Sequence, residues 1–179
     1  MVRITAGQWR GRRLEVPPGI RPTTELARKA AFDILGLGVR EACVLDAAAG
    51  SGAYGLEALS RGASRAILVE ADRTVRAVLE RNVAALGAGG HCDVRGMTVA
   101  AFVARAPAVG GSLLDVIFHD PPFADDSEDD LRGLLRLLAP GGTLFHEAGG
   151  EPGRPPGSLV PDEVRRYGKT RLLIFRRPC

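Results

Sequence analysis

The stretch from Val44 to Gly55 constrains this chain more than any other part of its sequence. A short apolar run ends in Asp46, three alanines follow, and Gly50-Ser51-Gly52 leads into Leu56–Arg61. This order predicts a buried strand, a tight turn and the first turns of a helix. Glycine lets the backbone approach a ligand closely, and a helix N-terminus presents unpaired N–H groups. We therefore expect this turn to bind a nucleotide-like cofactor, although Gly-x-Gly-x-x-Gly alone is a weak signal.

Strands and helices are expected to alternate on both sides of this turn. The predicted strands cover residues 42–46, 65–70, 91–95, 113–119 and 143–147, and the predicted helices cover 54–61, 74–86, 98–106 and 131–138. Such alternation is typical of a doubly wound, mostly parallel sheet with crossover helices, a Rossmann-like α/β fold. Residues 163–167 and 170–176 are expected to add an antiparallel pair at one edge, which gives seven strands.

The N-terminal 40 residues differ from the rest of the chain in charge. Residues 3–16 predict a hairpin, and a helix is expected from Glu25 to Leu35. Its apolar face is expected to carry Leu26, Ala30 (or Lys29) and Ile34, with Phe32 and Leu35 beside them. Residues 1–40 carry a net charge of +5, and residues 41–179 carry −2. We interpret residues 1–40 as a basic extension for a polyanionic partner and 41–179 as the enzyme domain, although a solvated surface would explain the charge equally well.

Composition excludes several other classes of protein. The 179 residues, 45% of them hydrophobic, suffice for one well-buried domain. No apolar run approaches the ~20 residues that span a membrane, and the N-terminus lacks the apolar core of a secretion signal, so a cytoplasmic enzyme is expected. The three cysteines are odd in number and show no paired spacing, which argues against both a disulfide framework and a zinc site.

Candidate site residues fall where the predicted parallel strands end, which is where open α/β sheets bind ligands. Gly50 and Gly52 follow the first strand, Glu70 ends the second, Asp93 lies by the third and Asp120 ends the fourth. The Glu70 carboxylate, 18 residues after Gly52, is well placed to accept hydrogen bonds from two ribose hydroxyls. That role suits a dinucleotide and S-adenosylmethionine alike.

Two features favour the methyl donor over a dinucleotide. Asp46 is expected to face the amino-acid end of the cofactor, where it would attract a sulfonium and an ammonium group and repel a pyrophosphate. The second feature is Asp120-Pro121-Pro122-Phe123. The prolines fix the backbone so that a main-chain carbonyl and the Asp120 carboxylate can hold one exocyclic amine, and Phe123 offers a face for an unstacked base. Most of the catalysis would then be orientation for an in-line transfer.

The histidines and the acidic run receive a different interpretation. His119 and His146 each precede an acid at the end of a strand, and the two strands are expected to be neighbours. Because the pattern supplies too few further ligands, no metal is predicted. The acids between Asp125 and Asp130 suit the start of a helix and need no ligand to explain them.

The sequence resembles the bacterial 16S ribosomal RNA guanine-N2 methyltransferases of the small-subunit type over nearly its whole length. The matching segments are Gly7–Leu14, Arg21–Thr24 with Arg28 and Phe32, Gly50–Ala63, Asn82, Asp120–Phe123 and Tyr167–Leu172. The resemblance implies a seven-stranded class I methyltransferase fold and methyl transfer to N2 of one guanine in small-subunit RNA. Two departures are Ala48, where the family usually has an aromatic residue, and His119, where it usually has an apolar one.

The predicted site therefore contains three groups of residues. The candidate catalytic residues are Asp120, Pro121, Pro122 and Phe123. The candidate cofactor-binding residues are Asp46, Ala48, Gly50, Ser51, Gly52, Glu70, Ala71, Asp93 and Asp120. The candidate RNA-binding residues are Arg10, Arg12, Arg13, Arg21 and Thr23. Replacing the arginines of the predicted N-terminal hairpin is expected to leave cofactor binding unchanged, because the cofactor turn should not depend on that hairpin.

Three other functions stay open at this point. An adenine-N6 methyltransferase would use the same amine chemistry, although 179 residues leave no room for a DNA target-recognition domain. A non-catalytic RNA-binding relative would have kept only the fold, and an oxidoreductase would bind a nicotinamide cofactor instead. The expected partner is small-subunit ribosomal RNA, naked or in an assembling 30S particle. The protein is expected to be a monomer that does not contact membranes.

Overall fold

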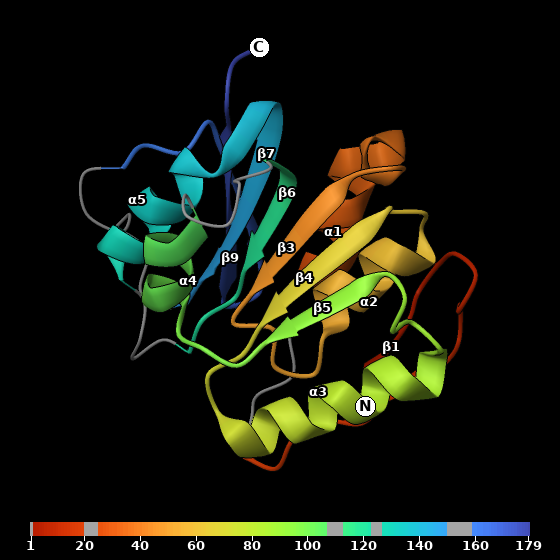
Figure 1. Cartoon of the computed structure of the whole chain (residues 1–179). Coiled ribbons are helices and arrows are strands. Elements are labelled where there is room, and N and C mark those ends of the chain that lie inside the picture. The colour runs from red at the N-terminus through yellow and green to blue at the C-terminus, as the bar shows by residue number, and fades with distance from the viewer. Residues whose placement is uncertain (1, 20–24, 107–112, 123–126, 150–158) are drawn as a thin grey trace.

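The computed structural model describes residues 2–19, 25–106, 113–122, 127–149 and 159–179. A seven-stranded sheet in the order β5-β4-β3-β6-β7-β9-β8 forms its centre (Figure 1). The strands are β3 (Cys43–Ala47), β4 (Arg65–Val69), β5 (Cys92–Arg95), β6 (Leu114–His119), β7 (Leu138–Ala148), β8 (Glu163–Tyr167) and β9 (Thr170–Arg176). β5, β4, β3, β6 and β7 are parallel, whereas β9 is antiparallel to both β7 and β8. The predicted doubly wound, mostly parallel sheet is therefore confirmed.

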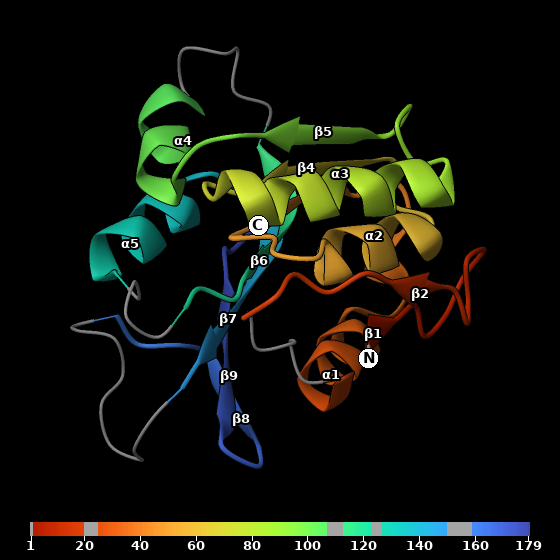
Figure 2. The same cartoon turned by 90° about the horizontal axis from the view of Figure 1, so that it is seen from below.

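Five α-helices cover the two faces of this sheet among the described residues. α1 (Glu25–Leu35), α2 (Ala53–Ser60) and α3 (Arg73–Leu86) lie on one face, and α4 (Val99–Arg105) and α5 (Glu128–Arg136) lie on the other (Figures 1 and 2). A short 3-10 helix, η1 (Gly36–Val39), follows α1. Each face buries its own hydrophobic core, so the strands between them are apolar on both sides. None of the described helices has the length and apolar character that a membrane span requires.

The predicted bounds of α3, 74–86, agree with the observed Arg73–Leu86 to within one residue, because both ends have a local cap. The Asp72 side chain accepts hydrogen bonds from the backbone N–H groups of Thr74 and Val75 at the start of α3. Gly87 ends the helix in the left-handed conformation with φ 68°. Both are short-range signals that the sequence carries on its own.

The bounds of α1 are confirmed, and its predicted apolar face is confirmed at Phe32, Ile34 and Leu35, which pack on the core, but is wrong at Leu26. The helix buries Ala27, Arg28, Ala31 and Phe32, and Leu26 is 67% exposed. Aromatic packing decides the orientation, because the Phe32 ring lies 5.2 Å from the ring of Phe118 on β6. The resulting rotation turns the side that carries Leu26 outward.

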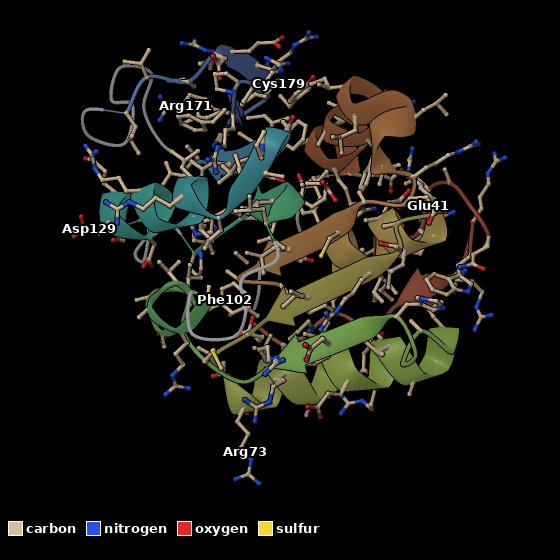
Figure 3. The ribbon with its side chains drawn as sticks, turned by 45° about the horizontal axis from the view of Figure 1, so that its top comes forward. Glu41, Arg73, Phe102, Asp129, Arg171 and Cys179 are labelled. Atoms are coloured by element: carbon tan, nitrogen blue, oxygen red, sulfur yellow. The ribbon has the colours of Figure 1, made fainter. Side chains whose placement is uncertain are left out.

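Two boundaries on the other face also differ from the prediction. α5 begins at Glu128 rather than Leu131, because the Ser127 hydroxyl caps it by accepting from Asp130 N–H and three acids occupy its first turn. One of them, Asp129, projects into solvent (Figure 3). β7 begins at Leu138 rather than Thr143, and the segment 140–142 lies inside it as an irregular stretch opposite β6, where the pairing register shifts.

The predicted N-terminal hairpin is confirmed as β1 (Val2–Arg3) paired antiparallel with β2 (Arg13–Leu14). It lies beside α1 and α2 (Figure 2). Val2, Ile4 and Leu14 are buried in the same hydrophobic core as α1, α2, α3 and the sheet. The functional division at residue 40 therefore stays a prediction, while one continuous core extends across that boundary.

Candidate active site at the carboxyl ends of the parallel strands

The turn after β3 uses its glycines for different purposes. Gly50 has φ 55°, and a Cβ built on it would meet nothing within 4 Å, so this backbone faces open space. A Cβ on Gly52 would lie 2.5 Å from Leu79 Cδ1 of α3, and one on Gly55 would lie 2.2 Å from a Leu68 methyl of β4. Gly50 therefore leaves room for a ligand, whereas a side chain at Gly52 or Gly55 would displace the buried leucines that pack there, Leu79 and Leu68.

Ala48 shows that this turn is held in a restricted conformation. Its φ of 64° lies in the left-handed region, which non-glycine residues rarely adopt. The turn is fixed by hydrogen bonds from Ala49 N to Val69 O at 2.9 Å and from Gly52 N to Ala49 O at 2.7 Å. The backbone is thus preorganised around Gly50, and Ser51 lies between the two glycines of this turn.

Glu70 lies directly after β4, beside the turn. Its Oε2 accepts from Gly50 N at 3.0 Å, and its Oε1 accepts from Asp72 N at 2.8 Å. The side chain is half-buried, and each carboxylate oxygen keeps a further lone pair. The carboxylate is therefore fixed in orientation and still able to accept hydrogen bonds from hydroxyl groups. Ala71, the next residue, is exposed.

Asp46 is placed differently from what its sequence position led us to expect. The side chain is buried, and its Oδ2 accepts from Gly55 N at 2.8 Å at the start of α2. Burial raises the pKa of Asp46 to about 8, and the nearby carboxylates of Asp120 and Glu70 act in the same direction. The raised pKa favours the protonated form of Asp46 near neutral pH as long as no cation lies beside it. Its role toward a cofactor stays a prediction.

Asp120 and Pro121 follow β6 at the same edge of the sheet. Asp120 is half-buried, Pro121 is buried and Pro122 is exposed. Ala47 of β3 pairs with Val69 on one side and with His119 on the other, so Glu70 and Asp120, the next residues of those strands, follow at the same edge of the sheet as Asp46. Phe123 lies outside the described residues.

Asp93 is not part of this group of carboxylates. It pairs with Ile67 in the sheet, two residues before β4 ends. Its Oδ2 accepts from Arg65 Nη2 at 2.9 Å and from Arg95 Nη2 at 2.7 Å. These ion pairs give Asp93 a structural explanation, and its predicted contact with the cofactor stays untested.

Sequence reasoning missed a buried polar contact at the end of β7. The Tyr54 hydroxyl, in the first turn of α2, donates to Glu147 Oε1 at 2.5 Å. Burial raises the pKa of Tyr54 well above its ordinary value, and the charges of Glu147 and Asp120 act in the same direction. The Tyr54 ring stacks on Phe118 with 4.4 Å between centroids. The partners are far apart in sequence, so no local pattern signalled this contact.

The two histidines are neighbours, as predicted. His119 and His146 occupy paired positions on β6 and β7, and their Nδ1 atoms lie 3.1 Å apart. Both side chains are buried. Within the described part of the chain, no group of three or more His, Cys, Asp and Glu side chains is arranged to hold a metal ion.

The arginine-rich hairpin is attached firmly to α2. The fully buried Glu57 carboxylate accepts from the backbone N–H groups of Thr5 and Ala6 at 2.8 and 3.0 Å. Gln8 N donates to Ser60 O at 2.8 Å, at the last residue of α2. Gly7 is required there, because a Cβ on it would lie 1.7 Å from Ser60 O. The backbone partners of Glu57, Thr5 and Ala6, lie about 50 residues before it in the chain, so no local pattern pointed to this contact.

The predicted RNA-binding residues on this hairpin are exposed. Arg10, Arg12 and Arg13 all reach solvent, and Arg12 Nη2 also donates to Ala85 O at 2.8 Å. Arg21 and Thr23 lie outside the described residues. The hairpin thus presents three cations on a support that is anchored to α2.

A family model described as "Conserved hypothetical protein 95" matches residues 2–176. The chain belongs to this family. It is 44% identical over 153 residues to ribosomal RNA small subunit methyltransferase D of Escherichia coli, a match that covers 82% of this chain and 71% of that protein.

Solved structures agree with this relationship. The putative methyltransferase yhhF from Escherichia coli superposes with a TM-score of 0.84 at 37% identity, over 99% of this chain and 98% of that one. An RNA methyltransferase from Salinibacter ruber, solved with S-adenosyl-L-homocysteine, has a TM-score of 0.68 at 18% identity over 88% of this chain and 94% of its own, and shows the same fold. The family resemblance and the class I methyltransferase fold predicted from the sequence are confirmed.

Proposed function

We propose that this protein transfers a methyl group from S-adenosylmethionine to the exocyclic N2 amine of a guanine in small-subunit ribosomal RNA. The observation that carries the proposal is the meeting of Glu70, Gly50 and Asp120 at one edge of the sheet. Similarity to ribosomal RNA small subunit methyltransferase D supports ribosomal RNA as the substrate class. The guanine N2 position rests on the family resemblance of the sequence.

The residues of the turn fit S-adenosylmethionine as the cofactor. The Glu70 carboxylate, held by Gly50 N and Asp72 N, would accept hydrogen bonds from the ribose hydroxyls. The open space over Gly50 would receive the part of the cofactor that lies against the backbone. When bound, the cofactor supplies a methyl group attached to positively charged sulfur.

Asp120 and Pro121 would act on the amine of the target base. The Asp120 carboxylate and a main-chain carbonyl of this segment accept hydrogen bonds from the amine and orient its nitrogen lone pair. The same carboxylate stabilises positive charge on the nitrogen until its proton leaves to solvent. Because Pro121 and Pro122 fix φ, the two acceptors are held in place before the substrate arrives.

Methylation of purified RNA tests the proposal directly. The protein, labelled S-adenosylmethionine and small-subunit RNA, naked or in 30S particles, are incubated, and the RNA is digested to nucleosides for mass spectrometry. N2-methylguanosine is the expected product. N6-methyladenosine would identify the adenine alternative, and RNA binding without methyl incorporation would identify a non-catalytic relative. Comparing both substrates also decides between naked RNA and the particle.

The exposed arginines of the hairpin test the RNA partner separately. Replacing Arg10, Arg12 and Arg13 together by Ala should weaken RNA binding, because fewer phosphates are neutralised. The slope of log affinity against log salt should fall by about 0.7–0.9 for each phosphate that the variant no longer neutralises. RNA affinity over a salt series checks this, and affinity for S-adenosylmethionine without RNA should stay at the parent value. Equal slopes for the parent and the triple variant would contradict a role for the hairpin.

The cellular location and the oligomeric state belong to the same proposal. A ribosomal RNA methyltransferase works where ribosomes assemble, so we expect a cytoplasmic protein. We also expect a monomer, which sedimentation at assay concentrations would check.

A further inference from the structure

Asn82, on the second half of α3, joins two parts of the molecule that are far apart in sequence. Its Nδ2 donates to the carbonyl oxygens of both Glu15 and Ser51, each at 2.9 Å. Its Oδ1 accepts from Glu15 N at 2.8 Å. The side chain is only 4% exposed, and both amide hydrogens and the carbonyl oxygen are used. Its position and orientation are therefore fully determined by these three hydrogen bonds.

One of these parts is predicted to bind RNA and the other to bind the cofactor. Glu15 directly follows β2, the returning strand of the arginine-rich hairpin. Ser51 lies between Gly50 and Gly52 in the turn after β3. Among the described residues, no backbone hydrogen bond joins residues 13–19 to residues 48–52, so Asn82 provides a link that the main chain does not.

The neighbouring contacts show that the hairpin strand lies along α3. Arg81 Nη2 lies 2.6 Å from Glu15 Oε1 in an exposed ion pair, and Arg12 Nη2 donates to Ala85 O. These contacts hold the hairpin against α3 without reaching the turn. Asn82 alone among these α3 side chains contacts both Glu15 and Ser51.

We infer that Asn82 is a positioning residue that couples RNA binding at the arginine-rich hairpin to cofactor binding at the turn after β3. The inference rests on the proposed function. The Glu15 backbone holds Asn82, and Asn82 holds the Ser51 carbonyl in the conformation that leaves Gly50 open, so RNA bound at the hairpin would favour this conformation further. Linkage then requires that the cofactor tighten RNA binding by the same factor. From the sequence we expected cofactor binding at the turn not to depend on the hairpin. On this inference, that expectation holds only when no RNA is bound.

The variant Asn82→Asp isolates the link. It has nearly the same size and keeps an oxygen that accepts from Glu15 N, but it places a second oxygen against two carbonyls. Calorimetry should show S-adenosylmethionine binding to the parent about fivefold more tightly with a small-subunit RNA fragment present than without it. In Asn82→Asp this factor should fall to about one, and the affinity without RNA should fall about tenfold.

Arg81→Ala is the matched control, since it removes the other side-chain contact to Glu15 but leaves Ser51 untouched. It should keep the coupling factor of the parent. At saturating S-adenosylmethionine, turnover of Asn82→Asp should approach the parent value, because Asp120 is unaffected. A merely structural role would lower turnover and affinity together, and equal coupling in Asn82→Asp and Arg81→Ala would overturn the inference.

Hydrogen exchange in the parent protein provides a second test if Asn82→Asp does not fold. Adding S-adenosylmethionine alone should slow exchange of the Glu15 amide, which donates to Asn82, although Glu15 lies outside the turn. Slower exchange in the turn with no change at Glu15 would also overturn the inference. A parent that binds S-adenosylmethionine but does not methylate RNA would instead refute the proposed function, so the two failures are distinguishable.

Discussion

The two halves of the candidate active site are built by different kinds of contact. At the ends of β3 and β4, backbone N–H groups fix the carboxylates: Gly50 and Asp72 hold Glu70, and Gly55 holds Asp46. At the ends of β6 and β7, side chains contact other side chains, as Tyr54 does with Glu147 and His119 with His146.

This difference indicates a division of work. A carboxylate held by backbone N–H groups has a fixed position, which suits the binding of a cofactor that is the same in every reaction. Asp120 follows a strand whose Phe118 belongs to a packed aromatic layer, in which Tyr54, Phe118 and Phe145 stack with centroids 4.4 and 5.5 Å apart. That layer supports the end of β6, from which the segment 120–122 continues. We therefore expect substitutions in the first half to change affinity and substitutions in the second half to change turnover or stability.

The largest expected effect is that of Asp120→Asn. The variant keeps the shape but loses the charge that stabilises a cationic amine, so turnover should fall about 100- to 1,000-fold. Affinity for RNA should change little. Single-turnover methylation measures the first effect, and calorimetry measures the second. Parent-like turnover would contradict the assignment of Asp120 to the chemistry.

Glu70→Ala should act on cofactor affinity instead. Losing charge-assisted hydrogen bonds costs about 1.5–3 kcal/mol, or about ten- to a hundred-fold in affinity. Gly50→Val should weaken binding as well, because its side chain would fill the open space and the φ of 55° disfavours it. Calorimetric titration with S-adenosylmethionine checks both. Unchanged affinity in Glu70→Ala would show that Glu70 does not bind the cofactor. It would also contradict the proposal that residues at the ends of β3 and β4 determine cofactor affinity.

Tyr54→Phe tests the hydrogen bond between Tyr54 on α2 and Glu147 on β7, which connects the two halves of the site. The ring and its stacking on Phe118 remain, but the buried Glu147 carboxylate loses a donor, so stability should fall by about 1–3 kcal/mol. Urea denaturation measures this. Tyr167→Phe, at the other tyrosine of the chain, is the control and should cost less. Equal stabilities of Tyr54→Phe and the parent would show that the hydroxyl contributes nothing.

Asp46→Asn should change the pH dependence of stability. The folded protein keeps the Asp46 proton up to a pKa of about 8, while the unfolded chain loses it near the ordinary value of 3.8. The free energy of unfolding should therefore decrease as the pH rises between these two values. Asn carries no titrating proton, so the curve should be flatter in the variant. Denaturation across this pH range checks it, with Asp33→Asn as an exposed control that should follow the parent.

The features that were predicted well from the sequence depend on short-range contacts. The turn after β3, the extent of α3 and the hairpin of β8 and β9 all arise from residues close together in the chain. The orientation of α1 was predicted only in part: Leu26 is exposed because the helix turns so that Phe32 packs against Phe118, which lies in a different part of the sequence.

In the site, too, the features set by short-range contacts were predicted and those set by long-range contacts were not. Its acids were located from strand ends, but the burial of Asp46 and the partner of Tyr54 depend on how α2 packs on the sheet. Asn82 entered the prediction only through the family resemblance, because its partners Glu15 and Ser51 lie 67 and 31 residues away. Distances of that kind are decided by tertiary packing, which a single sequence does not display.

The attachment of the hairpin to α2 has a consequence for how a substrate is chosen. The helix of 8 residues begins at the turn after β3 and ends at Ser60, where the hairpin is fixed. At 1.5 Å per residue its length is about 12 Å, and Glu57 and Gly7 keep the hairpin from sliding along it. If the hairpin binds RNA phosphates as proposed, α2 is a spacer of fixed length, and we expect an RNA to be accepted when its phosphates and its target base are spaced to match the helix. Lengthening α2 by one turn should change which nucleotide is reached before it changes how tightly the RNA is held.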